Sequence, residues 1–181
     1  MAETTLKTLI DRFRGRPEWQ HPDPSVRAEA VLRLPAAEAE LIAALAREDA
    51  DPRVRRAAVK RIDAVALLAE IAGSDADQGV LEEASARIAH AALNAHDAAA
   101  AVAAVAALRD ARQLASVAKS ARLAEAREAA IRALGDPKSL SGVVREAADA
   151  RSRLLALARI EDAATLVGFA CAGTILVLHV H

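Results

Sequence analysis

The chain has 181 residues, of which 54% are hydrophobic but only 2% aromatic, and its formal net charge is −1. A charge this close to zero provides no global field to attract nucleic acid or an anionic membrane. The single cysteine excludes an intrachain disulfide framework and a paired-cysteine metal site. With only 7 Gly and 6 Pro, a composition dominated by Ala, Leu and Val predicts an all-α protein.

The N-terminal residues 1–22 are expected to form a cap. A short amphipathic helix is predicted over residues 5–14, followed by a loop that contains Trp19 and ends at Pro22. The apolar residues of this helix recur at helical spacing: Leu6, Leu9, Ile10 and Phe13. The first residues lack a charged stretch followed by an apolar one, so they do not form a secretory signal. We therefore expect a cytoplasmic protein.

One sequence motif, which we call the repeat phrase, then recurs along the chain. It reads DPSVRAEAVLRL from Asp23, DPRVRRAAVKRI from Asp51 and DARSRLLALARI from Asp149. Aspartate is a favoured helix N-cap, and proline is favoured at the first helical position, so each phrase is expected to open a helix. The apolar residues of the phrases fall on one helical face: Val26, Ala30, Val31 and Leu34; Val54, Ala58, Val59 and Ile62; Val80, Ala84 and Ile88. An internal repeat of this kind predicts a stacked helical array.

A second phrase marks the other helix of each pair. It begins at Leu108, Leu134 and Ile160, which are 26 residues apart, and continues with an aspartate two positions later. Between Ile88 and Leu108 the interval shortens, and the chain is rich in alanine. We expect one helix to end near residue 95 and another to span about 98–108.

The phrase from Asp51 to Val59 resembles the core of HEAT-type repeats, in which each unit is an antiparallel helix pair. Residues 5–164 are similar to the N-terminal region of bacterial proteins that carry domain of unknown function 349. That family brings no catalytic residues. The resemblance implies an α-solenoid of about five or six short HEAT-like helix pairs over residues 23–170.

The last residues, 171–181, depart from the repeat. No charged residue occurs after Asp162, whereas a terminal repeat normally presents a polar face to water. Three interpretations remain open. The end is a last helix with a strand-like extension covered by another chain, a membrane-associated end, or the product of truncation or a shifted reading frame. No membrane span is expected, and self-association through this apolar end is one consequence of the first interpretation.

The candidate site consists of charged residues that recur in the repeat phrases. Two interpretations apply to them: a structural ladder in which each arginine bonds an aspartate or a carbonyl of the adjacent repeat, and a partner-binding stripe along the groove. The structural interpretation is favoured. The candidates are Asp23, Arg27, Asp51, Arg55, Arg56, Arg127 and Arg153.

No residue pattern predicts catalysis, a cofactor or a metal site. His90 and His96 are six residues apart, which is not the three- or four-residue spacing of ligands on one helical face. Cys171 lies in an apolar stretch without a cation to lower its pKa, so a buried thiol is expected rather than a nucleophile. The sequence therefore predicts a protein that is not an enzyme.

Two functions are compared. The first is a non-catalytic HEAT-repeat scaffold that binds a protein partner through its groove. The alternative is a nucleic-acid-binding or DNA-repair module of the helical-repeat glycosylase type, which would use the cationic residues between Arg53 and Arg61. The near absence of aromatic residues for base stacking favours the scaffold.

Overall fold

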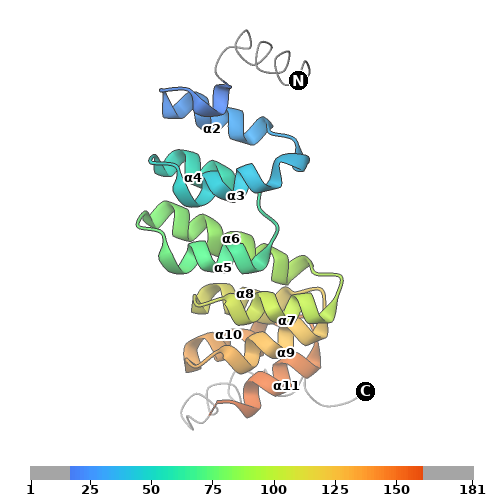
Figure 1. Cartoon of the computed structure of the whole chain (residues 1–181). Helices are drawn as coiled ribbons and strands as arrows, with labels where there is room; N and C mark the ends of the chain where they lie inside the picture. The colour runs from blue at the N-terminus through green and yellow to red at the C-terminus, as the bar shows by residue number, and fades with distance from the viewer. Residues whose placement is uncertain (1–16, 161–181) are drawn as a thin grey trace, which may run out of the picture. The chain divides into compact units, whose positions relative to one another are not determined.

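The computed structural model describes residues 17–160, and within this part every regular element is a helix (Figure 1). The all-α prediction is therefore confirmed for the described residues. The helix predicted over residues 5–14 and the apolar tail lie outside them. The elements are η1 (Glu18–Gln20), α2 (Pro24–Arg33), η2 (Ala36–Glu38), α3 (Ala39–Glu48), α4 (Pro52–Val59), α5 (Val65–Ser74), α6 (Gln78–Asn94), α7 (Ala98–Ala107), α8 (Ala111–Ser120), α9 (Ala124–Ala133), α10 (Pro137–Glu146) and α11 (Ala150–Ala158).

The chain divides into two compact units. Unit 1 comprises the residues up to Ile62 together with Ile71–Ala84, and unit 2 comprises Asp63–Glu70 together with the residues from Ser85 onward. Unit 1 thus contains α2, α3 and α4, and unit 2 contains α7 to α11. Helices α5 and α6 each contribute to both.

The repeat phrases form one class of helix, the first helices α2, α4, α6, α7, α9 and α11. In four of them the aspartate before the helix is an N-cap whose carboxylate accepts a backbone N–H bond; these N-caps are Asp23, Asp51, Asp97 and Asp149. Asp77 does the same for α6 by accepting the Val80 amide at 3.1 Å. Helix α9 departs from the expected pattern, because it opens at Leu123 with no side-chain cap.

We call the residue before each first helix its opening residue: Asp23, Asp51, Asp77, Asp97, Leu123 and Asp149. Apolar residues recur at fixed distances from these opening residues. Seven residues after the opening residue, each first helix carries a buried alanine, at most 6% exposed: Ala30, Ala58, Ala84, Ala104, Ala130 and Ala156. A small side chain at this position lets neighbouring helices approach closely in a well-packed core. Four residues further on, a leucine or isoleucine closes each phrase, and all but Leu34 are buried: Leu34, Ile62, Ile88, Leu108, Leu134 and Ile160.

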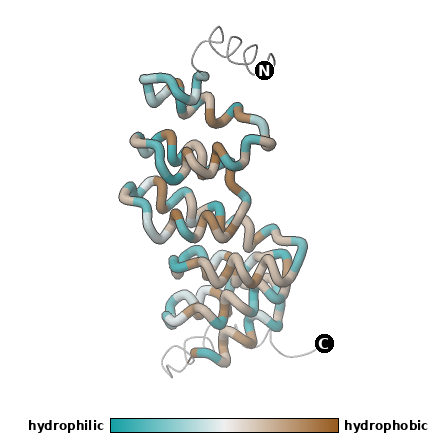
Figure 2. Tube along the Cα trace, in the orientation of Figure 1, coloured by the Kyte–Doolittle hydropathy of each residue, from teal (hydrophilic) through white to brown (hydrophobic). Residues whose placement is uncertain are grey.

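In unit 2 the helices recur every 26 residues. The first helices α7, α9 and α11 open at residues 97, 123 and 149, and the second helices α8 and α10 open at 110 and 136. Helix α9 packs against both α7 and α11, and α10 packs against α8, so the unit has one layer of first helices and one of second helices (Figure 1). The hydropathy trace shows that α7 is apolar along its whole length (Figure 2).

In unit 1, α4 packs against both α2 and α3, and η1 packs against α2. The η1 turn lies where the sequence predicted only a loop, because Pro17 and Glu18 carbonyls accept the Gln20 and His21 amides at 2.8 and 3.1 Å. Within residues 17–160, no helix is both long enough and apolar enough to cross a membrane.

The interval that the sequence predicted to be short is the one between α6 and α7. Their opening residues, 77 and 97, are only 20 positions apart, and no second helix lies between them. Helix α6 instead continues to Asn94, and α7 begins at Ala98 as predicted.

Candidate functional site

Two of the candidate arginines make nearly identical double hydrogen bonds in unit 1. Arg27 donates from Nε and Nη2 to the Asp49 carboxylate at 2.9 and 2.8 Å. Arg55 donates from the same two nitrogens to Asp75 at 2.7 and 2.8 Å. Both aspartate side chains are only 7% exposed. This planar, two-point geometry is the strongest form of arginine–carboxylate contact, so each pair fixes a first helix to the loop before the next one.

The remaining nitrogen of each arginine also has a fixed partner. Nη1 donates to a backbone carbonyl six residues earlier, with distances of 2.7–2.9 Å, in Arg27, Arg55, Arg127 and Arg153. Each arginine stands four residues after its opening residue, one turn into the helix, from which Nη1 reaches back to the loop before it. In Arg27 and Arg55, one guanidinium group thus ties the loop before its own helix to the loop before the next first helix.

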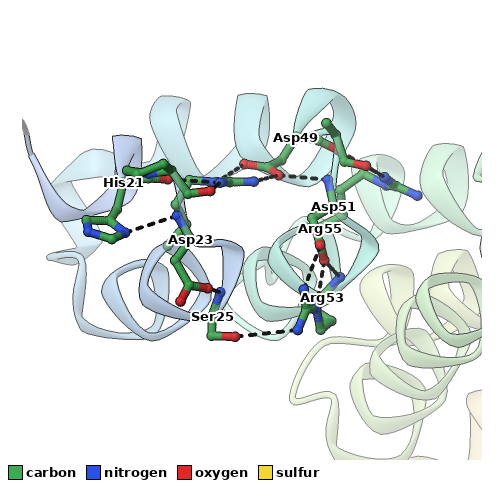
Figure 3. Close-up of polar contacts among 10 residues, drawn as sticks. His21, Asp23, Ser25, Asp49, Asp51, Arg53 and Arg55 are labelled. Carbon is green, nitrogen blue, oxygen red and sulfur yellow. Dashed lines mark hydrogen bonds and ion pairs between the residues drawn. The ribbon is translucent and has the colours of Figure 1, made fainter.

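The aspartates of these pairs accept bonds from more than the arginine. Oδ1 of Asp49 accepts the Asp51 amide at 2.9 Å (Figure 3), and Oδ1 of Asp75 accepts the Asp77 amide at 2.8 Å. Burial opposes ionisation of Asp49, but the bonds from Arg27 and from the Asp51 amide outweigh it and lower its pKa. The bond from Arg55 is the main cause of the lowered pKa of Asp75.

The corresponding contact in unit 2 is looser. Nε of Arg127 lies 2.9 Å from Oδ2 of Asp149, but the two atoms are not aligned as a hydrogen bond, and the Asp149 side chain is 33% exposed. Asp149 is also the N-cap of α11, where it accepts the Ser152 amide at 2.9 Å. Burial raises the pKa of Asp149, yet its bonds to Ser152 and the charge of Arg127 bring it below the ordinary value. We call the three contacts Arg27–Asp49, Arg55–Asp75 and Arg127–Asp149 the rungs.

The other candidate residues have separate local roles. Asp23 and Asp51 do not pair with Arg27 and Arg55; each caps its helix by accepting the amide two residues later, at 2.8 and 2.9 Å (Figure 3). Hydrogen bonds from the side chain and amide of Arg53 lower the pKa of Asp51 to about 2. Arg56 pairs with Glu83 at 3.0 Å on the surface of unit 1.

The cationic residues between Arg53 and Arg61 are therefore matched by anionic or carbonyl groups. Arg53 pairs with Asp51 at 2.9 Å, and Lys60 approaches Glu83 at 3.9 Å beside Arg56. Arg61 donates to the carbonyl of Leu34, the C-cap of α2, at 2.7 Å and also bonds the Leu32 carbonyl. Because the carboxylates of Asp51, Asp75 and Glu83 lie among these cations, the positive field that they present to a phosphate backbone is reduced.

Sequence reasoning missed a second set of arginines, located ten residues after the opening residue. Arg61 and Arg159 occupy this position in α4 and α11, and each donates to the C-cap carbonyl of a preceding first helix, Leu34 at 2.7 Å and Leu134 at 3.3 Å. Arg87, at the same position of α6, pairs with Asp63. The signal was present in the phrases, which end KRI, ARI and ARI, and cations are favoured at helix C-termini.

The exposed side of the second helices in unit 2 is polar and cationic. The side chains of Arg112 and Ser116 on α8 and of Lys138 and Arg145 on α10 are exposed. Lys119 of α8 pairs with Glu146 of α10 at 2.9 Å, which ties the two helices together at this surface. The polar groups of α8 and α10 thus form one continuous face, which we call the second-helix face.

Within residues 17–160, no three His, Cys, Asp or Glu side chains are grouped so that they could hold a metal ion. His90 and His96 are both exposed, and His96 Nδ1 lies 2.8 Å from Nη1 of Arg122 rather than near His90. Comparisons of the chain with protein-family models, with curated proteins and with solved structures find no match.

Proposed function

We propose that this chain is a HEAT-like repeat scaffold, an α-solenoid of short helix pairs that binds a protein partner without catalysing a reaction. The observation that carries the proposal is the strict 26-residue recurrence of first and second helices in unit 2. Arrays of stacked helix pairs create extended surfaces from repeated units, and such surfaces serve protein recognition. The resemblance of the repeat phrases to HEAT-type and domain of unknown function 349 proteins supports the same function.

The partner is proposed to bind the second-helix face rather than the rungs. The rung arginines in unit 1 and unit 2 already use their guanidinium groups in intramolecular contacts, so releasing them would loosen the fold. The second-helix face, in contrast, presents Arg112 and Lys138 to solvent on helices held in register by the Lys119–Glu146 pair. Because the helices are already ordered, binding there costs little conformational entropy. The cationic side chains favour an acidic segment of a partner protein.

The test is crosslinking from this face in cells. A photoreactive amino acid at Ser116, which is exposed on α8, is expected to capture a discrete protein partner. The double variant Arg112→Glu/Lys138→Glu should abolish that capture while keeping the helical circular dichroism. The matched control, Glu38→Arg/Glu40→Arg, also reverses two exposed charges but lies in unit 1, and it should retain capture. Equal capture by both double variants would contradict the proposal.

Nucleic-acid binding is the competing function, and salt dependence separates the two. If the cationic residues of α4 contact phosphates, binding to single- or double-stranded DNA should fall steeply with salt and disappear in Arg56→Gln/Lys60→Gln. We expect no such binding, because Arg56 and Lys60 both lie beside the carboxylate of Glu83, at 3.0 and 3.9 Å, which competes with a phosphate for them. Salt-sensitive binding that these substitutions remove would favour the nucleic-acid module over the scaffold.

A further inference from the structure

Two of the large apolar side chains that remain exposed in the described residues occupy the same repeat position in unit 2. Val102 on α7 is 41% exposed, and Leu154 on α11 is 48% exposed. Each stands five residues after its opening residue, 97 or 149. In α9, which lies between them, that position holds Glu128. The two exposed apolar residues therefore flank a charged one.

The next turn of the same surface repeats the arrangement. Nine residues after each opening residue stand Ala106 on α7, Arg132 on α9 and Ala158 on α11, and all three are exposed. Arg132 pairs with Glu128 at 3.0 Å. We call this surface of unit 2 the outer face; it consists of Val102, Ala106, Glu128, Arg132, Leu154 and Ala158.

The outer face is complementary to itself under a two-fold rotation. An axis perpendicular to the helices, at the level of Ala104, Ala130 and Ala156, sets each first helix antiparallel to its own copy. On each of the three helices, the residue five positions after the opening residue then faces the residue nine positions after it in the other chain. Val102 meets Ala106, Leu154 meets Ala158, and Glu128 meets Arg132, so that large residues face small ones and acid faces base. A closed two-fold interface requires this kind of self-complementarity.

We propose that unit 2 pairs with a second copy of the chain through the outer face, forming a symmetric dimer. The helix between Asp97 and Arg109 carries no charge, and an exposed apolar helix surface of this kind marks a protein contact. The charges of α9 favour a second copy as the occupant. Glu128 pairs with Arg132 and with Arg151 of its own chain, at 3.0 and 2.7 Å, and a second copy sets an acid beside Arg132 and a base beside Glu128, which extends these pairs across the interface. This dimer surface is separate from the second-helix face.

The area of the outer face indicates the affinity to expect for the dimer. Three helices of about ten residues cover roughly 15 Å by 27 Å, given a rise of 1.5 Å per residue and a spacing of about 9 Å. This area is at the low end for specific protein interfaces, so a reversible dimer with a dissociation constant in the micromolar range is expected.

Sedimentation equilibrium of the full chain over about 1–200 µM tests the dimer. We expect a monomer–dimer equilibrium whose dissociation constant rises at least tenfold in Val102→Glu/Leu154→Glu. The matched control is Leu32→Glu, which alters an equally exposed leucine (47%) in unit 1 and should leave the equilibrium unchanged. A monomer at every concentration, or a dimer that the double variant does not weaken, would overturn the proposal and place any association elsewhere, including the C-terminal end.

A mixing experiment tests the two-fold geometry independently of apolar content. Arg132→Glu and Glu128→Lys each place like charges opposite one another, so each variant alone should be monomeric. An equimolar mixture restores an acid opposite a base at both positions and should form a heterodimer with near wild-type affinity. Circular dichroism verifies that each variant is folded. Failure of the mixture to associate would contradict the antiparallel pairing.

Discussion

Unit 1 and unit 2 use the same helical repeat but join successive repeats in different ways. In unit 1 the joints are two-point contacts between an arginine and a nearly buried aspartate, Arg27–Asp49 and Arg55–Asp75. In unit 2 the one rung is a single contact between two buried atoms that are not aligned as a hydrogen bond, and backbone bonds also join the repeats. These bonds run from Arg122 N to Leu93 O at 2.9 Å and from Ala148 N to Lys119 O at 3.4 Å.

The comparison indicates which features define the repeat and which can be exchanged. The alanine seven residues into each phrase and the N-cap before most first helices occur in both units. The arginine at position four is absent from α6 and α7, where Leu81 and Ala101 stand. Apolar packing therefore forms the helices in both units, whereas the rungs add specific joints. Unit 1 should accordingly be the more sensitive of the two to loss of a charge.

The largest loss of stability is expected from a charge placed at the buried alanine position that occurs in both units. Ala58→Asp in unit 1 and Ala130→Asp in unit 2 alter equivalent residues that are 0% exposed, and each should destabilise its own unit by at least about 3 kcal/mol. Denaturant unfolding monitored by circular dichroism measures this. Ala44→Asp, at an exposed position of α3, serves as the control and should change stability by less than about 0.5 kcal/mol. Near wild-type unfolding of Ala58→Asp would contradict the assigned helix face.

Removal of a rung arginine should distinguish the two units. Arg55→Ala leaves the buried Asp75 carboxylate without its counter-ion, and we expect a loss of about 3 kcal/mol. Arg127→Ala should cost less, about 1 kcal/mol, because it removes no aligned hydrogen bond from Asp149, which keeps its N-cap bond from Ser152. The same unfolding measurement compares them. Equal losses would show that the rungs contribute alike in both units.

Acid should weaken the rungs of unit 1. The pKa values of Asp49 and Asp75 are both lowered from 3.8, so the unfolded chain binds protons first as the pH falls. Stability is therefore complete above about pH 5 and declines toward pH 2. Melting temperatures across this range should fall less steeply in Asp75→Asn than in the wild type. Identical slopes would show that Asp75 does not contribute to the acid response.

The smallest loss of stability is expected from removal of an exposed ion pair. Arg53, in the first turn of α4, is 63% exposed and pairs with the N-cap Asp51 of the same helix, and pairs of this type contribute little because solvent screens them. Arg53→Ala should leave the melting temperature within error of the wild type. Arg61→Ala, which removes the bond to the α2 C-cap carbonyl, should lower it measurably. A larger loss for Arg53→Ala than for Arg61→Ala would reverse this ranking.

Much of the local structure could be predicted from the sequence. The phrases from Asp23, Asp51 and Asp149 predicted helices with the correct N-caps, because aspartate capping and apolar spacing act within one turn. The end of α6 and the start of α7 were also predicted to within a residue or two. These features depend on neighbouring residues alone.

The partners of the arginines could not be predicted in detail, because they lie 20–30 residues away. The sequence indicated an aspartate or carbonyl partner for Arg27 and Arg55 but not that Asp49 and Asp75 would supply it. The capping role of Arg61 depends on where α2 ends relative to α4, a tertiary relation. Helix α9 formed without the expected aspartate because its buried Ala126, Ala130 and Ile131 match the core positions of its neighbours.

Hydrogen exchange of the wild type and Arg55→Ala at pH 7, resolved by mass spectrometry, tests most directly the claim that one repeat is joined differently in the two units. Loss of the Arg55–Asp75 rung should speed exchange in α2, α3 and α4 and leave the protection of α9, α10 and α11 unchanged. Uniform loss of protection across both units, or no change in α2–α4, would contradict the account.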